Sequence, residues 1–205
     1  MFIKTGKLAI LAILFTFTPL TPGQNIHAQT TEDESGIYTA ISLMASSMHI
    51  DETGKPFIED DGGGLQLEFG YRFNPTFALG MSLGLANHET TEPGVDALFS
   101  SLQLLAYYRF CPDRPFRPYI KGGIGGYGLT VSEGPASANI SGGGVVIGAG
   151  FRFFFSSHFA IGLDMTHNII NYEKGKLSID SFSFETEIDE QGSQTSLALS
   201  FNYSF

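Results

Sequence analysis

The sequence is short of basic residues, of cysteine and of long apolar runs. Its 11 Lys and Arg stand against 21 Asp and Glu, so the formal net charge is −10. This balance excludes the basic stripe that nucleic-acid-binding proteins carry. Cys111 is the single cysteine, which rules out an intrachain disulfide. After residue 28, no apolar run is long enough to cross a membrane as a helix.

Residues 1–28 have the features of an export signal. Lys4 and Lys7 form a basic start, an apolar run occupies residues 8–20, and Ala28 offers a small residue for cleavage. A short N-terminal anchor helix is the alternative. We therefore predict a signal peptide at 1–28. Its removal leaves 9 basic and 21 acidic residues, a formal net charge of −12.

What the rest of the chain does have is alternation of large apolar residues with small or polar ones. TFALGMSLGLA (76–86) and SLALSFNYSF (196–205) both show it. A period of two predicts β-strands with unlike faces. A tilted membrane-spanning strand needs about nine to eleven residues, and the alternating segments are at least that long. We predict about eight strands, near 36–48, 63–73, 76–88, 97–110, 117–131, 143–155, 158–171 and 193–205.

The connections between these segments alternate in length. Tyr-Arg-Phe or Phe-Arg-Phe closes three even-numbered strands, at 71–73, 108–110 and 151–153, and a short connection follows each. The opposite connections are longer and polar, which is typical of outer-membrane barrels. Small residues in one parity suit a narrow lumen, which leaves the large apolar parity for lipid.

The predicted fold is thus all-β: an eight-stranded antiparallel up-and-down transmembrane barrel with short periplasmic turns and long outer loops. Residues 29–35 form a periplasmic N-terminal segment and 36–205 the barrel domain. The alternative is a soluble, lipocalin-like barrel with the apolar parity inside. KLSIDSFSFETEI (176–188) also alternates, but an extra spanning strand would make the strand number odd. We predict a long outer loop with β-hairpin character there.

The chain resembles the small OmpA/OmpX-type outer-membrane barrels, with the OmpW branch close behind. The matching stretches are GYRFNPTFALGMSLGL (70–85), FRPYIKGGIGGYG (116–128), GAGFRFFFSSHFAIGLDMTH (148–167) and TSLALSFNYSF (195–205). In that family the assembly machinery that inserts barrels reads the C-terminal aromatic residue. The resemblance therefore implies an insertion signal at Tyr203 and Phe205, and a location in the bacterial outer membrane. Such a pattern specifies a fold better than a function.

A group of charged residues falls in the parity predicted to face the lumen. We expect these side chains to pair in a structural network that plugs the barrel, because an unpaired buried charge is costly. A gated small conductance is the alternative, and an eight-stranded barrel excludes a wide pore. The predicted network consists of Glu68, Arg72, Arg109, Lys121, Arg152 and Asp164.

The sequence favours a structural or surface-interaction role without enzymatic activity, cofactor or metal site. Barrel lipid A deacylases use a Ser two residues after a His, whereas Asn168 and Ile169 follow His167. His49 and His88 fall at loop edges. The acidic outer loops favour a surface ligand over DNA or heparin-like partners, and they lack EF-hand spacing. The expected partners are membrane lipids and the assembly machinery, and the expected state is a monomer. An OmpW-like conduit for small apolar compounds and a lipid-modifying enzyme are the alternatives.

Overall fold

The computed structural model describes residues 35–50, 58–90, 95–134, 136–179 and 182–205, and these ranges form eight antiparallel strands. The predicted signal peptide at 1–28 and residues 29–34 lie outside the described residues. In the described ranges, no helix is long and apolar enough to cross a membrane. The strands are β1 (Gly36–Ile50), β2 (Ile58–Arg72), β3 (Phe77–Thr90), β4 (Val95–Arg109), β5 (Phe116–Glu133), β6 (Ala136–Phe154), β7 (Phe159–Ile179) and β8 (Phe182–Ser204).

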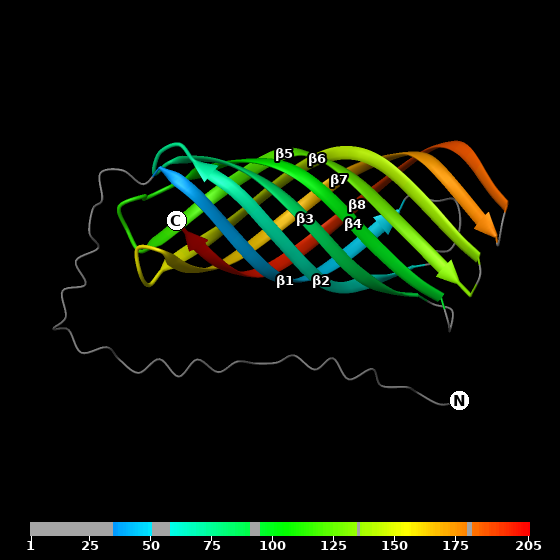
Figure 1. Cartoon of the computed structure of the whole chain (residues 1–205), viewed down its shortest axis with the longest axis horizontal. Helices are drawn as coiled ribbons and strands as arrows, with labels where there is room; N and C mark the ends of the chain where they lie inside the picture. Colours follow the sequence, from blue (N-terminus) through cyan, green and yellow to red (C-terminus); the bar gives the residue numbers. More distant parts are fainter. Residues whose placement is uncertain (1–34, 51–57, 91–94, 135, 180–181) are drawn as a thin grey trace, which may run out of the picture.

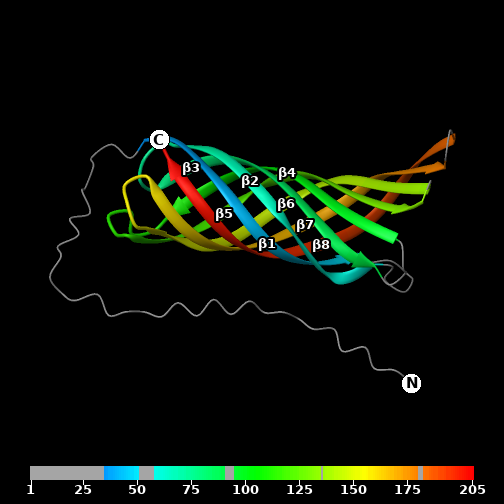
Figure 2. The same cartoon turned by 60° about the horizontal axis from the view of Figure 1, so that its bottom comes forward.

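Each strand pairs with the next, and β8 pairs with β1, so the sheet closes into a barrel (Figures 1 and 2). The closing register runs from Tyr38 opposite Ser204 to Ile50 opposite Gly192. Over that stretch every strand has a partner on both sides. Closure therefore gives hydrogen-bond partners to the backbone N–H and C=O groups, which lipid could not supply. The predicted eight-stranded, up-and-down barrel is confirmed.

Three short turns lie at the same end of the barrel as the C-terminus (Figure 1). In the first, the side-chain oxygen of Asn74 accepts hydrogen bonds from the backbone N–H groups of Thr76 (2.9 Å) and Phe77 (2.8 Å). In the third, the hydroxyl of Ser156 accepts one from Phe159 N–H at 3.0 Å. Short polar side chains of this kind replace backbone bonds in tight turns, which explains why so few residues suffice.

The large apolar residues face outward. Leu79, Leu83, Leu197 and Phe201 are each about half exposed, at 51–53%. Their neighbours in sequence, such as Ala78 and Ala198, are buried inside the barrel. The soluble, lipocalin-like alternative is wrong, because it requires these leucines to surround the barrel axis.

The lumen is filled by larger side chains than the sequence pattern suggested. Tyr38, Tyr107, Tyr172, Phe99 and Arg109 are among the largest fully buried side chains. A glycine opposite Tyr38 creates the room that its ring occupies. A Cβ atom at Gly70 would lie 2.3 Å from the ring of Tyr38, for example. Glycines that face the lumen therefore leave space for tyrosine rings on the same or the neighbouring strand.

Strands β7 and β8 continue well beyond the rim on the side opposite the short turns (Figure 1). Residues 176–179 of β7 pair with residues 182–185 of β8, so the hairpin character predicted for 176–188 is confirmed. The two strands run further than predicted, because β7 continues past residue 171 and β8 begins before residue 193. After a register shift between Tyr172 and Lys174 the ladder resumes, because the alternating pattern of the sequence continues on both strands.

Candidate functional site in the charged lumen

Glu68 of β2 is the centre of one cluster of lumen contacts. Its carboxylate accepts hydrogen bonds from the hydroxyls of Tyr38 on β1 and Tyr107 on β4, both at 2.7 Å. Nη2 of Arg152 on β6 lies 3.3 Å from Glu68 Oε1. This contact joins two strands that are not neighbours in the ring. Glu68 therefore ties four strands together across the lumen.

Asp164 of β7 is the centre of a second cluster. Lys121 Nζ on β5 lies 2.7 Å from Asp164 Oδ1, and the hydroxyl of Tyr119 donates to Oδ2 at 2.6 Å. The hydroxyl of Thr166 donates to Oδ1 at 2.6 Å. A buried carboxylate with three donors is well compensated for its lost hydration. The cluster crosslinks β5 to β7, which are separated by β6.

All six predicted lumen residues are buried, and four of them meet in these two ion pairs. Arg72 and Arg109 make neither pair. Arg72 is the last residue of β2, where it lies opposite Gly36. The Cζ atom of Arg109 lies 5.7 Å from the centroid of the Tyr38 ring, and Cζ of Arg152 lies 5.0 Å from the same centroid.

Sequence reasoning missed four residues of this site. Tyr38, Tyr107 and Tyr119 donate to the two carboxylates, and Arg117 is buried with its Nε donating to the carbonyl of Arg114 at 2.9 Å. The Arg117 guanidinium also lies 4.3 Å above the ring of Phe154. Parity was the available signal, because each of these residues alternates in phase with a charged lumen residue on its own strand or on the paired strand.

A layer of neutral polar side chains lies next to the charged clusters. The amide oxygen of Asn168 accepts hydrogen bonds from Gln103 and from the hydroxyl of Tyr127, both at 3.1 Å. The amide nitrogen of Asn168 donates to Gln194 at 2.6 Å. These contacts link β4, β5, β7 and β8. Among the described residues they form a second set of crosslinks inside the barrel.

Little free volume remains between the charged clusters. The cavity bounded by Glu68, Lys121, Arg152, Asp164 and Asn202 measures about 10 Å³. That volume is about what one water molecule requires. At this level the described side chains leave room for about one water molecule.

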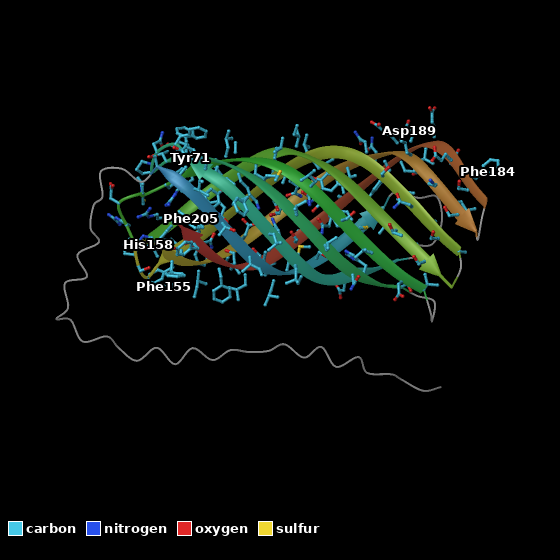
Figure 3. The ribbon with its side chains drawn as sticks, in the orientation of Figure 1. Tyr71, Phe155, His158, Phe184, Asp189 and Phe205 are labelled. Atoms are coloured by element: carbon cyan, nitrogen blue, oxygen red, sulfur yellow. The ribbon has the colours of Figure 1, made fainter. Side chains whose placement is uncertain are left out.

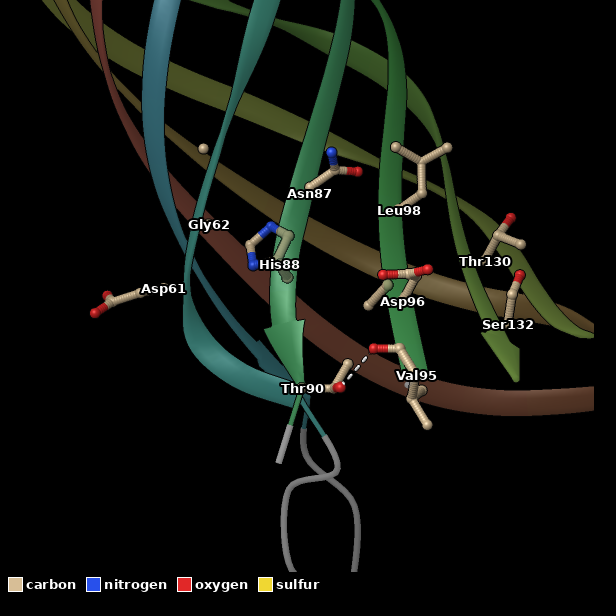
Figure 4. A pocket seen from close by; sticks show the side chains of 12 residues that line it. Asp61, Gly62, Asn87, His88, Thr90, Val95, Asp96, Leu98, Thr130 and Ser132 are labelled. Carbon is tan, nitrogen blue, oxygen red and sulfur yellow. Dashed lines mark hydrogen bonds between the residues drawn. The ribbon is translucent and has the colours of Figure 1, made fainter. Parts of the chain in front are cut away.

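The outer mouth holds a larger, open cavity of about 1140 Å³ at the ends of β2 to β5 (Figure 4). Most of its side chains are polar, namely Asp61, Asn87, His88, Thr90, Asp96, Thr130 and Ser132. His88 is buried, with Nε2 3.2 Å from the hydroxyl of Ser46. His88 lies near the outer end of β3, which continues to Thr90, and its imidazole fits against Gly62, where a Cβ atom would lie 2.7 Å away.

The contacts of His88, His158 and His167 do not form a recognisable catalytic group within the part of the chain that the structure describes. Ser157 and His158 lie 2.8 Å apart in an exposed turn, and His167 contacts Thr195 at 2.9 Å. Among the residues that the structure describes, no carboxylate is hydrogen-bonded to His88, His158 or His167. No group of three or more His, Cys, Asp or Glu in the described ranges is placed to hold a metal ion.

Aromatic side chains gather at the short-turn end of the barrel, where Figure 3 labels Tyr71, Phe155 and Phe205. Tyr203 and Phe205 form an edge-to-face pair with ring centroids 4.8 Å apart. Phe205 is 68% exposed, so its ring is available to another molecule. Aromatic girdles of this kind lie at the interface of the membrane with water.

A family model described as an outer membrane protein beta-barrel domain matches residues 15–205. No curated protein matches the chain. Several solved structures are similar, although the low identities mean that they support the fold alone.

Neisserial surface protein A is 16% identical, with a TM-score of 0.61 over 83% of this chain and 98% of its own. OprG from Pseudomonas aeruginosa is 14% identical, with a TM-score of 0.55 over 83% and 96%. A major outer membrane protein from Thermus thermophilus is 11% identical, with a TM-score of 0.57 over 82% and 99%.

Proposed function

The chain belongs to the outer membrane protein β-barrel family, and on that premise we propose that it is a plugged, monomeric barrel with a structural or surface-interaction role. It is a bacterial outer-membrane protein, whose outward apolar residues contact lipid. The single observation that carries the proposal is the pair of crosslinks across the lumen. Glu68–Arg152 and Lys121–Asp164 join non-neighbouring strands around a cavity of about 10 Å³.

Surface interaction is supported by the extension of β7 and β8 beyond the rim. Leu177 and Phe184 pair across this hairpin and are 49% and 80% exposed. Next to them, Lys176 and Glu185 form an exposed ion pair at 3.3 Å. Phe184 and Asp189 lie at the far end of the molecule from the aromatic rim (Figure 3). An apolar pair with a charged border on a projecting hairpin suits contact with another surface molecule.

The C-terminal strand supports recognition by the barrel-assembly machinery. Phe205 is exposed, yet its backbone N–H donates to the carbonyl of Ile37 at 3.0 Å, so the last residue has a defined position beside β1. We infer that Tyr203 and Phe205 act as the insertion signal.

The conduit and enzyme alternatives have less support. A path for apolar compounds requires an apolar cavity, whereas the cavity at the outer mouth is lined mainly by polar side chains. The layer of neutral polar side chains around Asn168 also lies in the lumen, where such a compound would have to pass it. Covalent catalysis requires a nucleophile, a base and a group that orients the base. Among the described residues, His88 and His158 each have a serine hydroxyl as hydrogen-bond partner, and no carboxylate is hydrogen-bonded to either imidazole.

Conductance of the refolded protein in a planar bilayer tests the plug. We expect no stable open channel in the wild type, because the cavity between the charged clusters has room for about one water molecule. The double variant E68A/R152A removes one crosslink and the side chains around it, and should increase the open-channel current. R114A, an arginine in an exposed turn, is the matched control. Large, steady unitary currents in the wild type would overturn the proposal.

A further inference from the structure

The small cavity between the two charged clusters lies beside the closing seam of the barrel, where β1 and β8 pair. Ala40 of β1 and Asn202 of β8 are direct neighbours across that seam, and both border the cavity. Strands β2, β5, β6 and β7 also contribute to its lining. Apart from Ala40 and Ala198, every residue of the lining is polar or charged. A volume of about 10 Å³ with such a lining suits one water molecule and is too small for a polyatomic solute.

Two polar atoms of residues that border this cavity lack a hydrogen-bond partner in the described part of the chain. One is an acceptor, Oδ1 of Asn202, and the other is a donor, Nε of Arg152. The two residues are only 4% and 5% exposed. A buried polar atom without a partner is costly. The cavity therefore favours a ligand that accepts from one group and donates to the other.

The charges around the cavity favour a neutral ligand. Glu68 and Asp164 are balanced by Arg152 and Lys121, with which they form the two ion pairs. An additional ion would leave a net charge in a buried site, which is unfavourable. Each carboxylate accepts three hydrogen bonds and offers about four acceptor positions, so about one position remains on each. A buried water makes about three hydrogen bonds, which this lining can provide.

The closing strand β8 donates to neither carboxylate among the described residues. The donors to Glu68 come from β1, β4 and β6, and the donors to Asp164 come from β5 and β7. Asn202 is the residue through which β8 brings an unpartnered atom to the cavity. A molecule held between Asn202 and Arg152 therefore extends the contacts of the charged clusters to β8.

We propose that one water molecule binds in this cavity, where it accepts a hydrogen bond from Arg152 Nε and donates one to Asn202 Oδ1. Its second proton goes to one of the two carboxylates that border the cavity. The water joins β8 to the ion pairs of the lumen and so stabilises the closing seam from inside the barrel. The site is independent of the surface role proposed above.

Magnetic relaxation dispersion of ¹⁷O counts long-lived buried waters, and water itself is the probe. The refolded wild type is compared with N202L, which keeps a similar side-chain volume but removes both polar atoms. We expect N202L to lose one long-lived water. N171L makes the same substitution at an exposed asparagine of β7 and should keep it. N202D, which retains an oxygen atom at this position, should keep it too.

Cross-relaxation between water and the Nε–H of Arg152, measured in ¹⁵N-edited spectra of the wild type, detects the water even if N202L fails to fold. For the seam, hydrogen exchange of the backbone amides of residues 196–204 should be about fivefold to tenfold faster in N202L than in N171L, as loss of one buried hydrogen bond implies.

Three results overturn the proposal. The first is an equal number of long-lived waters in the wild type and N202L, or no cross-relaxation at Arg152 Nε in the wild type. The second is loss of the water in N202D as well as in N202L, because packing rather than the oxygen of Asn202 would then hold it. The third is equal exchange of the β8 amides in N202L and N171L, because the water would then not stabilise the seam.

Discussion

The Glu68→Ala variant tests the charged lumen most directly. Glu68 is 7% exposed and accepts three hydrogen bonds, from Tyr38, Tyr107 and Arg152. The substitution leaves the Arg152 guanidinium buried without its carboxylate and two tyrosine hydroxyls without their acceptor. Removal of one partner of a buried ion pair costs about 3–5 kcal/mol. The two tyrosine hydroxyls that lose their acceptor can turn toward the space that the side chain leaves. We therefore expect the free energy of unfolding to fall by about 3 kcal/mol, the lower end of this range.

Glu185→Ala is the matched control. Glu185 is also paired with a cation at 3.3 Å, in this case Lys176 on the adjacent strand, but both side chains are at least half exposed. An exposed ion pair contributes about 0–1 kcal/mol. The two variants remove the same chemical group from an ion pair of the same length. They differ in burial and in the two tyrosine hydroxyls that donate to Glu68.

Urea unfolding of the refolded protein in detergent micelles, followed by far-ultraviolet circular dichroism, measures the free energy of unfolding. The chain has no tryptophan, so indole fluorescence is not an option. We expect the free energy to fall by at least about 2 kcal/mol more in E68A than in E185A. E68Q, which keeps the shape but not the charge, should fall between them. Equal losses in E68A and E185A would refute the reasoning that burial makes this network structural.

Three further predictions concern the lumen wall, the lipid face and the C-terminus. Gly70→Ala should cost about 1–3 kcal/mol, because its Cβ would lie 2.3 Å from the Tyr38 ring, whereas Gly126→Ala, with no heavy atom within 4 Å, should change little in the same urea assay. Leu83→Arg should cost about 2–4 kcal/mol if it lies near the bilayer midplane, and an unchanged midpoint in lipid vesicles would place it elsewhere. Phe205→Ala should leave the stability of the refolded barrel near that of the wild type but reduce its yield in cell membranes, judged by heat-modifiable gel mobility; an unchanged yield would remove Phe205 from the insertion signal.

The strands and their facing were predictable because alternation is a local property. In SLALSFNYSF (196–205) the side chains point to opposite faces whatever the rest of the chain does. The same reasoning placed Glu68 and Arg152 in the lumen. It did not extend to the outer ends of the strands. Strand ends in this sequence are marked only by weak polar signals. The predicted strand ended at residue 88, whereas β3 continues to Thr90.

The contents of the lumen were harder to anticipate than its location. The abundance of glycine suggested a small-residue lining, but Gly70 is small because Tyr38 on the paired strand occupies its space. Complementarity of this kind belongs to pairs of residues on different strands. A composition argument about one strand cannot detect it.

By itself, the sequence determined the barrel, its orientation toward lipid and six of the charges inside it, because strand periodicity depends only on neighbours along the chain. The tertiary structure alone decided which of those charges meet. Glu68 and Arg152 are 84 residues apart, and their contact depends on the stagger of the closed sheet, which sets the level of each side chain in the lumen. The same stagger leaves the Arg109 guanidinium without a hydrogen-bonded carboxylate among the described residues, since Glu68 is held by β1, β4 and β6 at once.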